Sequence, residues 1–257
     1  MSDVPSQFDL SGRVAVVTGG TRGIGLAISR GFAQAGADVV PVSRTEADVE
    51  AAVETVREEG ADSLVQPVDV TDEGDVERVF ERTVDELGGV DVVVNNAGVN
   101  PDGALGPPER VETEDFDFTT DVNLRGAFRC AKHAAPHLQE RGGNLVNVAS
   151  VGGLVGLPRQ HPYVASKHGL VGLTKSMALD WAPDVRVNAI APGYVSTELV
   201  EEVEQNERLR NSILDRTPLD RFADPEEVAG PALFLASDAA SYVTGSVLTA
   251  DGGWTAR

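Results

Sequence analysis

The chain has 257 residues, of which 41% are hydrophobic, and a formal net charge of −20. This length is ordinary for a single α/β domain, and the strong negative charge excludes a nucleic-acid-binding protein, which needs a basic face. No apolar run is long enough to span a bilayer, and Met1 to Leu10 lack the pattern of a signal peptide. The only cysteine, Cys130, excludes an intrachain disulfide or a cysteine-based metal cluster and predicts a reducing, cytoplasmic location.

The acidic residues are scattered along the chain, as in Glu50–Glu59 and Asp72–Glu77, and do not form a tail. They fall on the expected outer faces of helices. Charge repulsion of this size destabilises a fold at low salt and is screened at high salt. We interpret the composition as a halophilic adaptation to a salty cytosol, and the alternative is an ordinary acidic protein.

The first strand is predicted at residues 13–18, where β-branched residues dominate. Seven residues of glycine-rich loop follow, and then a helical pattern runs from Leu26 to Ala35. A strand, a glycine loop and a helix in this order predict a dinucleotide site, because glycine lets the backbone approach a pyrophosphate and the helix N-terminus offers free N–H groups. The alternative is a simple tight turn. The predicted contacts are Gly19, Thr21, Arg22, Gly23, Ile24 and Gly25.

The second strand, residues 38–43, ends in Ser43 and Arg44. A site for NAD(H) usually has a carboxylate at this position, bonding the ribose hydroxyls, and none is present. Guanidinium groups from Arg22 and Arg44, with the Ser43 hydroxyl, suit a ribose 2′-phosphate. The sequence therefore predicts NADP(H) over NAD(H), with a solvated Arg44 at a helix start as the alternative.

Strand and helix patterns continue to alternate along the rest of the chain. This alternation, without a break in composition, predicts one domain over 1–257 with a doubly wound parallel sheet of about seven strands and helices on both faces. The turn Asn95–Gly98 is expected at the carboxyl edge of that sheet, where ligands bind. The further predicted elements are helices over residues 46–59, 72–87 and 112–140 and strands over 64–68, 90–94 and 144–149.

A helix that begins near His161 carries Tyr163 and Lys167. Their spacing of four residues places both side chains on one helix face. The reference pKa of tyrosine is about 10, and a nearby ammonium is expected to lower it, so that the pair could exchange a proton with a carbonyl or alcohol oxygen. The alternative is an exposed helical pair without function.

Taken together, the ordered motifs resemble the short-chain dehydrogenase/reductase family over about Leu10 to Trp254. The resemblance rests on Thr18-Gly19-x-x-x-Gly23-Ile24-Gly25, Asn95-Asn96-Ala97-Gly98, Asn123, Ser150, Tyr163-x-x-x-Lys167 and Pro192-Gly193. It implies a single-domain Rossmann fold and an NADP(H)-dependent enzyme that interconverts a carbonyl and a secondary alcohol. The pattern is similar to that of 3-oxoacyl-thioester reductases, which we favour, and to that of enzymes for sugars, polyols and small ketones.

The resemblance also implies roles for individual residues. Tyr163 would be the general acid in reduction, Ser150 would hold the substrate oxygen, and Asn123 would position a water that links Lys167 to solvent. Lys167 would lower the pKa of Tyr163 and bind the nicotinamide ribose. Further cofactor contacts are implied for Asp69, Val70, Asn96, Gly98, Pro192, Gly193, Val195 and Thr197, and no metal is required.

Substrate specificity is expected from three loops, at residues 99–110, 151–162 and 198–216, the last as a mobile lid. Arg159, Gln160 and His161 are candidate substrate contacts, and Arg208, Arg210, Arg216 and Arg221 are candidates for a coenzyme A thioester. Relatives are commonly tetramers, so a homotetramer is expected through the helices at residues 112–140 and 163–182 and the strand at 246–250, with Trp254 at a subunit contact. A non-catalytic, redox-sensing nucleotide-binding protein is the rival interpretation.

Overall fold

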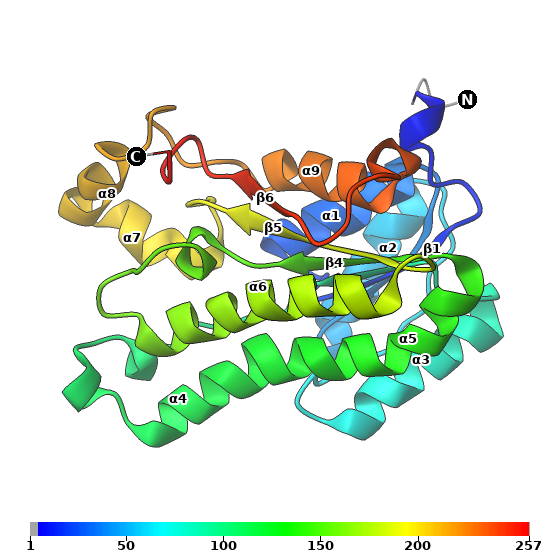
Figure 1. Ribbon diagram of the computed structural model, residues 1–257, viewed down its shortest axis with the longest axis horizontal. Helices are drawn as coiled ribbons and strands as arrows, with labels where there is room; N and C mark the ends of the chain where they lie inside the picture. Colours follow the sequence, from blue (N-terminus) through cyan, green and yellow to red (C-terminus); the bar gives the residue numbers. More distant parts are fainter. Residues whose placement is uncertain (1–4, 257) are drawn as a thin grey trace.

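The computed structural model describes residues 5–256 and shows one parallel sheet between two layers of helices (Figure 1). The predicted absence of a signal peptide over Met1–Leu10 falls partly outside the described residues, as do the ends of the predicted domain 1–257. The strand order is β2-β1-β3-β4-β5-β6, so the chain adds strands on one side of β1 and then on the other, and the strand order reverses between β1 and β3 as is typical of a doubly wound sheet. The strands are β1 (Val14–Thr18), β2 (Asp38–Val42), β3 (Val92–Asn95), β4 (Asn144–Val148), β5 (Arg186–Pro192) and β6 (Val247–Ala250).

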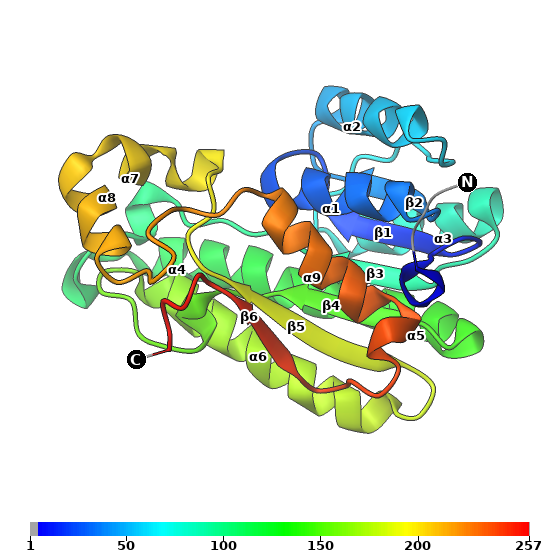
Figure 2. The same cartoon turned by 90° about the horizontal axis from the view of Figure 1, so that it is seen from above.

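Helices cover both faces of the sheet, as predicted (Figures 1 and 2). Valines with no exposed surface dominate the inner strands, because a parallel sheet is buried on both sides. One face carries α1 (Gly23–Gln34), α2 (Glu46–Glu58) and α9 (Glu226–Ala236). The opposite face carries α3 (Glu73–Leu87), α4 (Thr113–Thr120), α5 (Ala127–Arg141) and α6 (His161–Trp181). No helix in the described part of the chain is long and apolar enough to cross a membrane.

The strand expected at residues 64–68, the third in chain order of about seven predicted, does not form among the described residues. This segment runs beside β2 and makes single backbone contacts with it, from Val39 N–H to Asp62 O (3.1 Å) and from Val68 N–H to Ser43 O (2.8 Å). Pro67 has no N–H to donate, and the Gln66 side chain bonds the Pro67 carbonyl at 2.8 Å. The sheet therefore has six strands, and its edge is covered by an extended segment without a regular ladder.

The long helix expected at residues 112–140 is interrupted. Between α4 and α5 lies a π-helical segment, Asp121–Gly126, in which the backbone bonds skip one residue more than in an α-helix. The π-helical segment packs closely against its neighbours at two points. A Cβ on Gly126 would lie 2.8 Å from Val70 Cγ2, and a Cβ on Gly169 of α6 would lie 2.8 Å from Leu124 Cδ2. The glycines therefore let the π-helical segment approach its neighbours.

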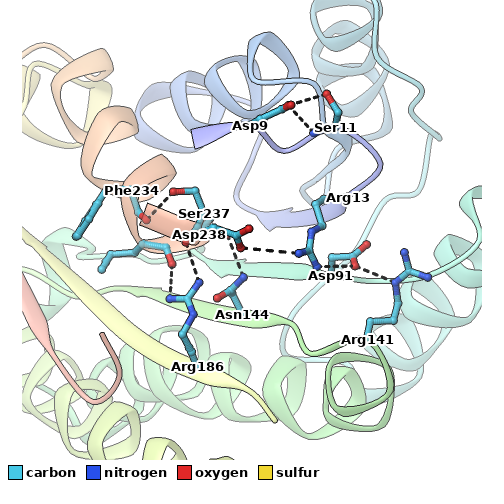
Figure 3. Close-up of polar contacts among 12 residues, drawn as sticks. Asp9, Ser11, Arg13, Asp91, Arg141, Asn144, Arg186, Phe234, Ser237 and Asp238 are labelled. Atoms are coloured by element: carbon cyan, nitrogen blue, oxygen red, sulfur yellow. Dashed lines mark hydrogen bonds and ion pairs between the residues drawn. The ribbon is translucent and has the colours of Figure 1, made fainter. Parts of the chain in front are cut away.

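A polar network joins the N-terminal ends of the strands (Figure 3). The Asp91 carboxylate, 2% exposed, accepts hydrogen bonds from Arg141 Nε (2.9 Å) and from Val14 N–H (2.9 Å), and Arg13 Nη1 lies 3.4 Å away. Arg186 donates to the Leu235 and Ser237 carbonyls at the end of α9. These contacts tie the starts of β1, β3 and β5 to the C-terminal ends of α5 and α9, opposite the edge that carries the functional groups.

Residues 198–216 form a small helical unit, as predicted, that projects at the carboxyl ends of the strands (Figure 2). It contains a short 3-10 turn (Glu198–Val200), α7 (Glu201–Gln205) and α8 (Glu207–Leu214). None of the residues in these three elements is buried. We refer to residues 198–216 as the lid.

Candidate active site

A cleft of about 700 Å³ opens along the carboxyl ends of the strands. Its walls come from the glycine loop, the ends of β2, β3, β4 and β5, the start of α6 and the lid. Every residue predicted from the sequence to contact the cofactor lines this cleft, and so do Ser150, Tyr163 and Lys167. Asn123 does not, because it lies behind the cleft wall and is 1% exposed.

The dinucleotide end of the cleft fits a phosphorylated nucleotide. The N-terminus of α1 has no side-chain cap, so its N–H groups remain available to an anion. Gly23, with φ of 50°, takes a left-handed conformation that favours glycine, and this carries the backbone into the helix start. The Ser43 hydroxyl is buried in the cleft wall and has no hydrogen-bond partner among the described residues. This is expected for a group that forms its hydrogen bond with a bound ligand.

Tyr163 and Lys167 lie on one face of α6, as their spacing predicts. Lys167 is 4% exposed, and its Nζ donates to the Val148 carbonyl at 2.7 Å and lies 5.7 Å from the centroid of the Tyr163 ring. Ser150, at the end of β4, accepts the Gly152 N–H at 3.0 Å. Strand end and helix start therefore bring the hydroxyls of Ser150 and Tyr163 to one point of the cleft.

The acid–base properties of this pair differ from the expectation. Burial raises the pKa of Tyr163 above its ordinary value, and the hydrogen bond with Ser150 opposes this shift without reversing it. Burial also lowers the pKa of Lys167 to about 8. The predicted lowering of the pKa of Tyr163 by Lys167 is therefore wrong for the free protein, because desolvation dominates both groups and no hydrogen bond joins them.

Asn123 is held by the π-helical segment and binds the protein itself. Its Oδ1 accepts the Val99 N–H at 2.7 Å, and its Nδ2 donates to the Val99 carbonyl at 2.9 Å and to Ser166 Oγ at 3.2 Å. Ser166 Oγ in turn donates to the Tyr163 carbonyl at 2.8 Å. The Asn123 side chain thus joins the turn after β3 to the helix of Tyr163, and its role in positioning a water stays a prediction.

The two arginines predicted to hold a 2′-phosphate line the same end of the cleft. Arg44 is exposed beside Ser43. Arg22 forms an ion pair with Glu198 of the lid, with 2.6 Å between Nη1 and Oε2. The sequence does not predict this pair, since its members lie 176 positions apart.

The substrate end of the cleft is largely apolar, with a small polar patch. Asn100 Nδ2 donates to Gln160 Oε1 at 3.1 Å, and the Gly106 N–H donates to the Arg159 carbonyl at 2.9 Å, so two substrate loops are joined. Gln160 lines the cleft as predicted, but Arg159 and His161 do not. The three loops expected to determine specificity supply most of the apolar wall, with Leu105, Leu157, Leu199, Val200 and Val203, whereas Phe118 and Tyr194 lie outside these loops and were not predicted.

Two further expectations concern residues outside the cleft. Trp254 is 4% exposed and is buried within its own chain, between the Arg216 guanidinium (4.2 Å from the ring centroid) and the Tyr194 ring (6.0 Å between centroids). The expectation that Trp254 is buried at a subunit contact is therefore wrong. His133 contacts Glu73 at 3.1 Å, and no group of three metal-ligating side chains occurs in residues 5–256.

This site combines a nucleotide cleft with a Ser-Tyr-Lys arrangement, which defines an oxidoreductase that acts on CH–OH groups. The chain belongs to the short-chain dehydrogenase/reductase family. A family model described as enoyl-(acyl carrier protein) reductase matches residues 19–255.

Relatives with two kinds of activity are similar to this chain. A 3-oxoacyl-[acyl-carrier-protein] reductase FabG of Thermotoga maritima is 42% identical over 248 residues, covering 95% of this chain and 98% of that protein. A 2-dehydro-3-deoxy-D-gluconate 5-dehydrogenase of Escherichia coli is 38% identical over 256 residues, covering 98% and 99%. The crystal structure of a gluconate 5-dehydrogenase from Burkholderia cenocepacia, in complex with NADP and tartrate, superposes with a TM-score of 0.93 at 35% identity and covers 98% of each chain.

Proposed function

We propose that this protein is an NADP(H)-dependent reductase of 3-oxoacyl thioesters. NADP(H) supplies or accepts the hydride when bound. Arg22, Ser43 and Arg44 would hold its 2′-phosphate, and the free N-terminus of α1 would hold its pyrophosphate. Structural relatives bound to NADP, such as the gluconate 5-dehydrogenase, support this choice of cofactor.

The chain's own residues would manage the substrate oxygen and its proton. Ser150 Oγ would orient the carbonyl oxygen and stabilise the charge that develops on it, and the Tyr163 hydroxyl would donate the proton during reduction. The Lys167 ammonium lies close to the ring and favours the phenolate that this transfer leaves behind. Asn123 would keep the turn after β3 and the start of α6 in register. The intact set of four residues favours an enzyme over a redox sensor, which has no chemical need of them.

The charge of the cleft supports a neutral carbonyl substrate over a sugar acid. Its only cationic lining residues, within the described part of the chain, are Arg22, Arg44 and Lys167, which lie at the nucleotide end or on the catalytic helix. A sugar acid would bring its carboxylate to an end lined by apolar side chains and by the acids Asp102 and Glu202. A 3-oxoacyl chain carries no charge there, and the exposed Arg208 and Arg210 on α8 would be available to the phosphates of a thioester carrier.

A sugar-acid dehydrogenase is the second candidate, because a relative with that activity is nearly as similar to this chain as the 3-oxoacyl-[acyl-carrier-protein] reductase. The linked amides of Asn100 and Gln160 could also serve a hydroxylated ketone. Oxidation of NADPH with acetoacetyl-CoA, 2-dehydro-3-deoxy-D-gluconate and a small ketone, in molar KCl and beside NADH, separates these candidates. We expect the highest kcat/KM for acetoacetyl-CoA with NADPH. Preference for the sugar acid contradicts the thioester assignment, and preference for NADH contradicts the cofactor assignment.

We further propose a cytoplasmic homotetramer. Large apolar side chains are exposed on the helices expected at the subunit contacts, with Phe116 and Phe128 on α4 and α5 (40% and 47% exposed) and Leu179 on α6 (83%). The edge strand β6 is also incompletely buried. Light scattering should give four times the monomer mass of 27.0 kDa, and Phe128→Glu should lower it.

A further inference from the structure

The lid is held at its two ends and by one bond to its middle, from Ser196 Oγ to Glu204 Oε1 of α7 at 2.6 Å. None of the residues in its helical elements is buried, so no core of its own holds it against the sheet. At its C-terminal end, Arg216 stacks on the buried Trp254 ring, 4.2 Å from the centroid. At its N-terminal end, Glu198 pairs with Arg22, and a Cβ on Gly23 would lie 3.1 Å from the methyl group of Thr197. The front of the lid therefore rests on the glycine loop.

The ion pair at the front of the lid is easily exchanged. The Arg22 and Glu198 side chains are 72% and 69% exposed, and such a pair contributes little to stability because water screens it. A ribose 2′-phosphate carries more charge than a carboxylate and can accept two parallel bonds from a guanidinium group. Both residues line the cleft with Ser43 and Arg44, so the phosphate and Glu198 compete for one cation.

We propose that Arg22 exchanges Glu198 for the 2′-phosphate of the coenzyme, so that Glu198 acts as a specificity-determining residue and as the latch of the lid. The inference rests on the proposed use of NADP(H). Without a 2′-phosphate, Arg22 holds the front of the lid on the glycine loop. With it, Glu198 loses its partner, and the lid turns about its anchor at Trp254.

The affinity test uses Glu198→Gln, with Glu202→Gln as its matched control. Glu202 lies on α7, lines the same cleft and has no ion pair within residues 5–256, so its substitution removes the same charge without touching Arg22. The probes are adenosine 2′,5′-bisphosphate and adenosine 5′-monophosphate, titrated by calorimetry at the lowest salt that keeps the fold intact. We expect Glu198→Gln to bind the bisphosphate about 2- to 5-fold more tightly than the wild type, with no change for the monophosphate or for Glu202→Gln. In 1 M KCl the gain should shrink, since salt weakens ion pairs between exposed side chains.

The lid itself is followed by limited trypsin cleavage after Arg208 and Arg210, which lie on α8. In the wild type, saturating bisphosphate should speed this cleavage relative to saturating monophosphate. Glu198→Gln should be cut quickly without a ligand and show no further response. Equal bisphosphate affinity in Glu198→Gln and wild type, or a cleavage rate that the bisphosphate leaves unchanged, contradicts the latch. If the wild type binds both probes equally, the proposed NADP(H) preference fails instead.

Discussion

The Lys167 amino group lies 5.7 Å from the centre of the Tyr163 ring and gives its hydrogen bond to the Val148 carbonyl, not to the phenol. No hydrogen bond joins the two side chains, so the role proposed for Lys167 depends on its charge near the ring. The strength of that effect depends on whether Lys167 is protonated, and burial lowers its pKa to about 8. The charge of Lys167 is thus sensitive to pH in a range where that of an exposed lysine is not.

Tyr163→Phe removes the proposed proton donor and keeps the ring. We expect turnover to fall by at least about 100-fold, because general acid catalysis contributes on that scale. Binding of NADPH, followed by its fluorescence, should be nearly unchanged, which separates a chemical defect from a folding defect. An active Tyr163→Phe protein would contradict the role given to this residue.

Lys167→Met tests the depressed pKa of the buried amine. The ordinary pKa of 10.5 applies to the unfolded chain and a value of about 8 to the folded protein, so between these pH values the unfolded chain binds more protons. The contribution of Lys167 to the free energy of unfolding therefore rises with pH across this window, and below pH 8 the buried ammonium opposes folding. The variant should be most stable relative to the wild type near pH 7, and this advantage should shrink towards pH 10.

Urea unfolding at several pH values measures that change. Lys175→Met is the control, because Lys175 is an exposed residue of the same helix. Its difference from the wild type should not vary with pH. If the Lys167→Met difference is equally flat, the buried amine has an ordinary pKa.

Gly126→Ala tests the close packing of the π-helical segment against Val70. A Cβ at this position would lie 2.8 Å from Val70 Cγ2, so we expect a loss of about 1–3 kcal/mol in the free energy of unfolding, and a lower kcat through Asn123. Adding Val70→Ala in the same chain should restore part of the stability. Gly172→Ala, on α6 with no atom within 4 Å of its Cβ, should be neutral or stabilising. Equal effects at both glycines would show that crowding is not the cause.

Trp254 offers a test of an unpaired buried donor. Its Nε1 has no hydrogen-bond partner among the described residues, while its ring packs under Arg216. Trp254→Phe should change the free energy of unfolding by less than about 1 kcal/mol, because no bond is lost, whereas Trp254→Ala should cost about 3–5 kcal/mol. A Phe variant as unstable as the Ala variant would mean that the indole N–H has a partner in solution.

The net charge of −20 predicts stabilisation by salt. Raising KCl from 0.1 M to 2 M shortens the screening distance from about 10 Å to below about 3 Å and should raise the Tm by several degrees. Differential scanning calorimetry measures this shift. An unchanged Tm would contradict the halophilic interpretation, which otherwise rests on composition alone.

Much of the fold could be predicted because its signals are local. The glycine loop, the valine-rich strands and the four-residue spacing of Tyr163 and Lys167 each depend on neighbouring residues. The strand expected at 64–68 was wrong because a β-rich composition outweighed Pro67, which cannot donate to a ladder. The π-helical segment was missed because the apolar pattern of residues 112–140 is continuous, and one extra residue in a turn leaves almost no trace in it.

The residues of the site likewise divide into those marked by local motifs and those that depend on contacts between distant parts of the chain. Motif residues could be placed from their order, and all those predicted to contact the cofactor line the cleft. The Arg22–Glu198 pair and the stacking of Arg216 on Trp254 join distant parts of the chain, so spacing cannot reveal them. The shift in the pKa of Tyr163 depends on burial, which the neighbours of Tyr163 in the sequence do not determine.

Because of the π-helical segment, the position of Asn123 depends on the number of residues between Thr120 and Ala127. Deleting one residue there would let the segment revert to an ordinary α-helix, and everything on its amino-terminal side would rotate by about 100° relative to α5. Asn123 could then no longer reach both Val99 and Ser166. A single-residue deletion in this turn should thus be more damaging than most substitutions, although no catalytic side chain is removed.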